Sequence, residues 1–68
     1  MTREKLVEAA EEFRRRKHEF DLAREKLADA MADAARAGMT PTEIIEISGY
    51  TREHVRRILR AAGVEPPT

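Results

Sequence analysis

The amino-acid sequence predicts an all-α protein with one long N-terminal helix and two short helices after it. Residues 2–37 contain neither glycine nor proline and are rich in alanine, leucine, glutamate, lysine and arginine, which favour helix. Apolar residues recur in this stretch at intervals of seven: Leu6, Phe13, Phe20, Leu27 and Ala34. Two later stretches each start at a threonine that suits a helix N-cap and stop at a glycine. A chain of 68 residues without cysteine needs well-formed helices, a partner, or both, to be stable.

The first predicted helix runs from Thr2 to about Ala37, and Gly38 follows as the residue that ends it. At about 1.5 Å per residue, a continuous helix of this length is roughly 50 Å long. Asp21 can also cap a new helix start, so a break near residues 18–21 is a second possibility. We expect three segments: a helical extension at 1–21, a folded domain at 22–64 and a tail at 65–68.

The second and third helices have clear start and stop signals. Residues 40–43 (Thr-Pro-Thr-Glu) form a capping box with proline at the first helical position, and Gly49 ends this helix. Thr51 caps the third helix and Gly63 ends it, with Val64 placed to pack back on the helix. The apolar residues of the two helices are Ile44, Ile45, Ile47, Val55, Ile58, Leu59 and Ala62.

The composition leaves little material for catalysis or metal binding. The chain has no cysteine, one serine and two histidines that lie far apart, His18 and His54. We therefore expect a protein that is not an enzyme and has no metal and no cofactor. No apolar run approaches the length of a membrane span, so we expect a cytoplasmic protein without a membrane partner.

Charges are segregated along the chain although the formal net charge is +0. Residues 14–17 are four consecutive basic residues, and residues 51–62 contain four arginines against the single acid Glu53. A nucleic-acid binder of zero net charge must concentrate its positive field locally, and this chain does so.

Residues 38–59 contain a helix, a three-residue joint around Gly49 and a second helix. This stretch resembles the DNA-binding helix-turn-helix of serine-resolvase C-terminal domains, sigma-factor region four and small bacterial repressors. The matching residues are Glu43, Ile44, Gly49, Tyr50, Thr51, Val55 and Ile58. The chain departs from the pattern at Ile45, where alanine is usual, and at Ser48, which is more polar than usual. The resemblance implies a trihelical helix-turn-helix domain whose third helix enters the major groove.

Packing indicates which side chains of the third helix face outward. Val55 and Ile58, three residues apart, are expected to face the second helix, so the arginines between and around them face away. The resemblance implies base contacts from Arg52, Glu53, Arg56 and Arg57. The expected phosphate contacts are Thr40, Thr42, Thr51, His54 and Arg60. The alternative interpretation of these residues is an ordinary solvated basic face.

The apolar stripe of the first helix predicts self-association. Leu27, Met31 and Ala34 are expected to pack on the second and third helices. The remaining apolar residues then have no partner within the chain: Leu6, Val7, Ala10, Phe13 and Phe20. We expect these five to form a homodimer interface, because a monomer rarely exposes such a patch. An antiparallel pair with Phe13 against Phe13 of the other chain is favoured, while a parallel pair or a fold-back at Asp21 stays open.

The basic run Arg14, Arg15, Arg16 and Lys17 has two interpretations. As a clamp it would bind DNA phosphates. As a structural feature it would pair with the acidic residues Glu8, Glu11 and Glu12, within the helix or across a dimer.

The function that these features predict is sequence-specific binding of double-stranded DNA. The protein would act as a homodimeric bacterial transcription regulator, a repressor or an accessory factor, with no small-molecule effector. The alternative is a protein-interaction adaptor whose helices bind a protein such as RNA polymerase or a toxin.

Overall fold

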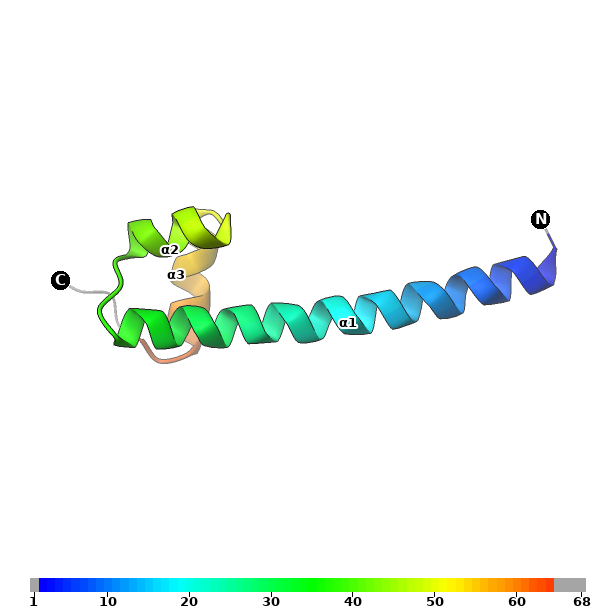
Figure 1. Cartoon of the computed structure of the whole chain (residues 1–68), viewed down its shortest axis with the longest axis horizontal. Coiled ribbons are helices and arrows are strands. Elements are labelled where there is room, and N and C mark those ends of the chain that lie inside the picture. Colours follow the sequence, from blue (N-terminus) through cyan, green and yellow to red (C-terminus); the bar gives the residue numbers. More distant parts are fainter. Residues whose placement is uncertain (1, 65–68) are drawn as a thin grey trace.

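The computed structural model describes residues 2–64, and this part of the chain is entirely helical (Figure 1). The helices are α1 (Arg3–Arg36), α2 (Pro41–Ser48) and α3 (Arg52–Ala61). The predicted all-α class and the long first helix are therefore confirmed. The expected tail at 65–68 lies outside the described residues.

α1 is one unbroken helix of 34 residues, and it gives the molecule a longest dimension of 57 Å. It passes through residues 18–21 without interruption, so the break or fold-back considered at Asp21 is wrong. The Thr2 hydroxyl caps its start by accepting a hydrogen bond from the Lys5 amide at 3.3 Å. Gly38 ends it in a left-handed conformation with φ of 102°. Within residues 2–64, no helix combines the length and the apolar character that a membrane span requires.

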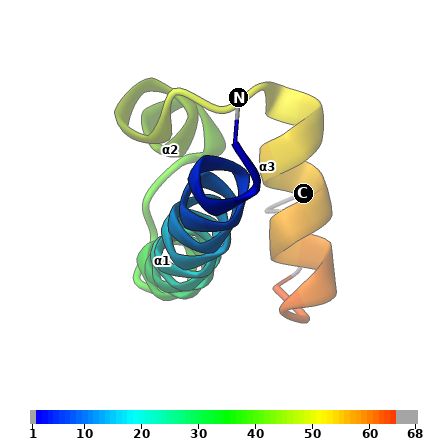
Figure 2. The same ribbon diagram turned by 90° about the vertical axis from the view of Figure 1, so that its right-hand side faces the viewer.

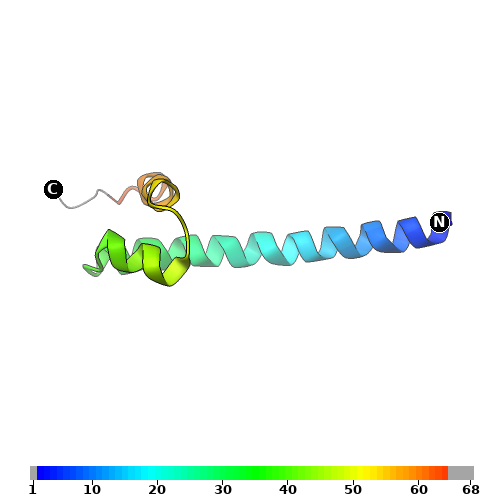
Figure 3. The same cartoon turned by 90° about the horizontal axis from the view of Figure 1, so that it is seen from above.

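α2 and α3 pack only on the C-terminal end of α1. Figure 1 shows both short helices gathered at that end, while the N-terminal part of α1 extends alone. α2 runs roughly alongside α1, whereas α3 runs across it (Figures 2 and 3). We call the unit of α2, α3 and residues 27–36 of α1 the head, and residues 3–26 of α1 the rod.

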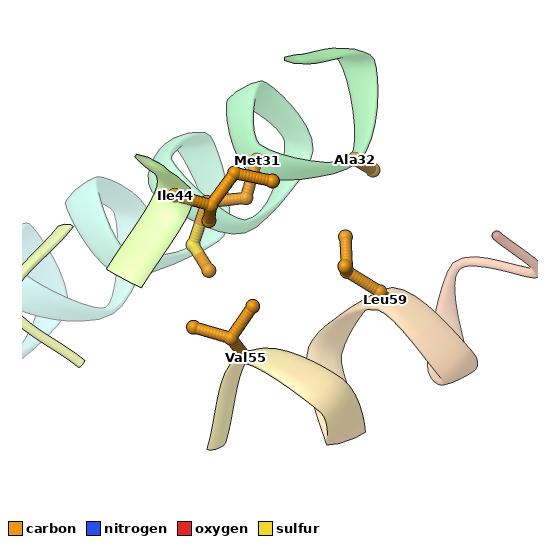
Figure 4. Close-up of a cluster of buried hydrophobic side chains, with 5 residues drawn as sticks. All are labelled: Met31, Ala32, Ile44, Val55 and Leu59. Carbon is orange, nitrogen blue, oxygen red and sulfur yellow. The ribbon is translucent and has the colours of Figure 1, made fainter. Parts of the chain in front are cut away.

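The head encloses a small apolar core to which all three helices contribute (Figure 4). Its buried residues are Met31, Ala32, Ile44, Val55 and Leu59. Partly buried residues pack around them: Leu27, Ala35, Met39, Ile45, Tyr50, Ile58 and Val64. The predicted return of Val64 onto the third helix is confirmed, since its amide also donates to the Leu59 carbonyl at 2.9 Å. Ile47, in contrast, is 75% exposed.

The core agrees with the expectation on α3 and differs from it on α1. On α3, Ile58 packs against the core as expected but is only partly buried, while Leu59 joins Val55 among the buried residues. On α1, Ala32 and Ala35 join the core, whereas Ala34 is only half-buried and lies outside it. The expected position followed a seven-residue repeat, which drifts by about 20° per heptad on a straight helix. By Ala34 this drift has moved the repeat off the buried face.

Arg36 ties the end of α1 to the end of α3. Its Nη2 donates a hydrogen bond to the carbonyl of Ala62, the C-cap residue of α3, at 3.0 Å. Its Nη1 lies 3.3 Å from Oδ1 of Asp33 one turn earlier. A carbonyl at a helix end lacks an intrahelical donor, so this contact satisfies it and fixes the two helix ends together.

Candidate nucleic-acid interface

The joint between α2 and α3 is held by local hydrogen bonds. Gly49 adopts φ of 74°, a left-handed conformation in which a Cβ is strained, and its amide donates to the Ile45 carbonyl at 3.0 Å. The Ser48 hydroxyl accepts from the Tyr50 amide at 3.2 Å, a contact that the sequence did not indicate. The Thr51 hydroxyl accepts from the His54 amide at 3.1 Å. These bonds set where α3 begins relative to α2.

α3 turns one face to the core and the opposite face to solvent. Val55 and Leu59 are 1% and 7% exposed, so the residues opposite them point outward. At about 100° per residue from the midpoint of Val55 and Leu59, Arg57, Glu53 and Arg60 lie about 120–180° away, and Arg56 lies at one edge, about 80° away. Arg52 lies only about 40° away around the helix, but it precedes Val55 by almost one turn, at the start of α3. All five side chains belong to exposed residues. We call these five residues the basic face.

The four arginines of the basic face have no carboxylate partner in the part of the chain that the structure describes. The ion pairs formed there involve Arg16, Arg24 and Arg36, all on α1. The single acid of the face, Glu53, lies in the first turn of α3, where it interacts favourably with the helix dipole. The guanidinium groups can therefore bind an external anion, and their planar forks match phosphate oxygens or the acceptor edge of guanine.

His54 lies beside the basic face and stacks on Tyr50. The two rings have centroids 4.4 Å apart and planes that differ by 5°. Tyr50 also packs against the core, so it anchors the imidazole at the start of α3. Helix periodicity does not predict this stacking, because Tyr50 lies in the joint before α3 begins.

The threonines at the start of α2 lie apart from the basic face. The Thr40 hydroxyl accepts from the Glu43 amide at 3.2 Å, as a capping residue does, and Thr42 is exposed in the first turn. α2 separates both from the start of α3 by its own length, about 12 Å. The expected phosphate residues thus form two groups, one at each end of α2, with Thr51 and His54 in the second.

The basic run of residues 14–17 lies on the rod rather than beside α3. Arg16 pairs with Glu12 at 3.7 Å and with Glu19 at 3.5 Å, whereas the Glu11–Arg15 pair that the spacing allowed is not formed. The other three basic residues of the run form no ion pair within residues 2–64. The run ends about 15 Å along the helix axis from Leu27, where contact with α2 and α3 begins.

The five residues expected at a dimer interface all lie on the rod. Leu6, Phe13 and Phe20 are 59%, 68% and 63% exposed, Val7 is 44% exposed, and Ala10 is half-buried. Leu22, which is not among these five residues, is also an exposed apolar residue of the rod, at 46%. The large apolar side chains of the rod are therefore exposed to solvent in the single chain, which agrees with the expectation that they do not pack on the second and third helices.

No protein-family model, no curated protein and no solved structure matches this chain. What the basic face binds is therefore inferred from its own chemistry. Among residues 2–64 there is also no cluster of three or more histidine, aspartate or glutamate side chains placed to hold a metal ion.

Proposed function

We propose that this protein binds double-stranded DNA sequence-specifically, as a homodimeric transcription regulator that acts as a repressor or accessory factor. In this proposal α2, the joint at Gly49 and α3 constitute a helix-turn-helix, with α3 as the recognition helix. The observation that carries it is the basic face: four exposed arginines that form no ion pair within residues 2–64, on the helix that buries Val55 in the core.

The dimensions of α3 suit the major groove, which admits one α-helix. Arg52, Glu53, Arg56 and Arg57 are the proposed base-reading residues, since they lie in the first two turns. An arginine fork can donate two hydrogen bonds to guanine O6 and N7, and Glu53 can accept from the amine of cytosine. Arg60, at the other end of α3, is the proposed phosphate contact.

The capped helix starts provide further phosphate contacts in this proposal. The first amides of a helix lack intrahelical acceptors and carry the positive end of the dipole. Thr51 and His54 stand at the start of α3, and Thr40 and Thr42 at the start of α2. Phosphates bound at both helix starts would fix the orientation of α3 in the groove without reading sequence.

The test begins by selecting duplexes that the protein retains from random DNA. Binding of the selected and a scrambled duplex is then measured at two salt concentrations for Arg56→Ala, Arg60→Ala and the control Lys26→Ala. Lys26 is exposed on α1, and its replacement removes the same charge. Arg56→Ala should cost about 1–3 kcal/mol on the selected duplex and relax preference at one base pair. Arg60→Ala should weaken both duplexes equally and reduce the salt dependence.

Three results would count against this function. Failure to retain any duplex at low salt would contradict DNA binding and favour the adaptor alternative, in which the basic face binds an acidic protein surface. Equal losses for Lys26→Ala and the α3 variants would mean that α3 has no special role. An equal loss on both duplexes for Arg56→Ala would make Arg56 a phosphate contact, and specificity would then have to come from other residues.

A further inference from the structure

The chain exposes more surface than a compact monomer of its size. Its accessible area is 5825 Å², whereas a compact 7.8-kDa protein exposes about 4,400 Å². The difference exceeds the roughly 800 Å² per partner that a standard protein interface buries. The rod contributes to this excess, because neither α2 nor α3 covers it and its large apolar side chains are exposed to solvent.

We propose that a second copy of this chain covers the rod in antiparallel orientation, with the two-fold axis beside Phe13. This inference deepens the proposed function, from which it takes the homodimer, by naming the orientation and register of the pair. It rests on three features of α1: the direction of its apolar face, the length left free, and the distribution of charge.

The direction of the apolar face excludes a parallel pair in register. Leu6, Phe13 and Phe20 lie seven residues apart, and the next residue in the series, Leu27, already packs in the head. At about 100° per residue, the stripe on the rod and the core residue Met31 point to the same side of α1. In a parallel pair, residues 27–36 of the two copies would meet on the side where α2 and α3 already lie.

The free length of α1 sets the register of an antiparallel pair. The rod runs from Arg3 to Lys26, and the part of α1 that packs in the head begins at Leu27. A symmetric pair that covers most of this length must be centred near its middle. Centring at Phe13 places Leu6 beside Phe20 of the partner, so that three layers of large apolar side chains meet. The N-terminus of each rod then ends next to the partner's head, opposite Ala23.

The charges of the rod complement one another only in this orientation. Residues 4–12 contain four glutamates and one lysine, whereas residues 14–22 contain four basic and two acidic residues. Centring at Phe13 places the first segment of each copy alongside the second segment of the other. A parallel pair would instead place each segment against its own copy, acid against acid and base against base, which is unfavourable.

Spin-label distances measured without DNA test this arrangement. Single cysteines replace Glu4, Glu11 or Glu25. These residues are exposed, and the helix period places each at least about 100° around α1 from Leu6, Phe13 and Phe20. The chain has no native cysteine, so each variant carries one label per copy. At about 1.5 Å per residue, the labels of the two copies are separated along the axis by about 6 Å at position 11, 27 Å at position 4 and 36 Å at position 25. Position 11 should therefore give the shortest distance.

A charge variant supplies the matched control. Phe13→Glu should raise the dimer dissociation constant about 100-fold or more, since each dimer loses two buried phenyl groups. His18→Glu introduces the same charge on an exposed residue away from the stripe and should leave the constant within a few-fold. Helix content measured on each variant verifies that the chain is folded.

Several results would overturn the register. Equal distances at the three positions would indicate a parallel pair, and a shortest distance at position 4 or 25 would indicate another centre. A stable monomer at tens of micromolar in sedimentation would show that the chain does not form the proposed dimer at all. All of these measurements are independent of DNA, so their failure leaves the proposed DNA binding by α3 to be judged on its own experiment.

Discussion

The head and the rod are built on the same helix and show the same apolar face, yet only the head buries it. In the head, the core side chains of α1 are 3–4% exposed, whereas the large apolar side chains of the rod are 44–68% exposed. The difference arises from what packs on each part of α1: α2 and α3 cover the head, whereas no other element of residues 2–64 covers the rod. A helical apolar stripe thus reveals which face will be buried, but not whether the chain itself or a partner covers it.

The largest difference between head and rod is expected when one large side chain in each is replaced by alanine and the stability of the head is measured. Ile44→Ala removes a core residue that is 2% exposed, and we expect it to lower the free energy of unfolding of the head by about 2–5 kcal/mol. Phe13→Ala removes an open side chain and should leave the intrinsic stability of the head unchanged. Denaturant unfolding at two protein concentrations tests both. A large, concentration-independent loss for Phe13→Ala would mean that rod and head are not separate.

The second prediction concerns the joint in the head. Gly49→Ala should cost about 1–2 kcal/mol, because Gly49 holds a left-handed conformation in which alanine is strained. Gly49→Asn should cost less, since asparagine tolerates this conformation better. Thermal unfolding of the three proteins checks the order. Equal stability of all three would show that the joint relaxes to another conformation.

Removing the hydrogen bond between the ends of α1 and α3 should lower the free energy of unfolding by a smaller amount. Arg36→Gln loses the hydrogen bond to the Ala62 carbonyl, and we expect a loss of about 0.5–1.5 kcal/mol. The loss should be accompanied by faster amide hydrogen exchange in the last turn of α3. Unchanged exchange there would show that the core alone fixes the end of α3.

The smallest change in the free energy of unfolding is expected from the loss of ion pairs on the rod. Arg16→Gln removes ion pairs with Glu12 and Glu19 that are largely exposed to solvent, so it should cost no more than about 0.5 kcal/mol. High salt should abolish even this difference. A larger loss that depends on protein concentration would place Arg16 in contact with a partner.

The local signals in the sequence predicted most of the fold. Thr2, Thr40 and Thr51 cap the three helices and the glycines end them, since caps and stops depend on a few neighbouring residues. Contacts between distant residues were harder to predict. The sequence gives no sign that Arg36 would reach Ala62, or that Leu59 would be buried more deeply than Ile58, because both depend on how α3 crosses α1. Helix periodicity was enough to predict that the arginines of α3 are exposed. Periodicity carries no information about the molecule that these arginines bind.

The absence of any break in α1 has a consequence for spacing. With the two-fold axis at Phe13, the middle of each head near Met31 lies about 27 Å from the axis, so the two heads lie about 54 Å apart. One turn of B-form DNA is about 34 Å, so a dimer of this register would not fit half-sites one turn apart. Inserting seven residues into the rod would move each head outward by about 10 Å with almost the same orientation, whereas four residues would also rotate it. The length of the rod, counted in heptads, would then determine which separations of half-sites the protein accepts.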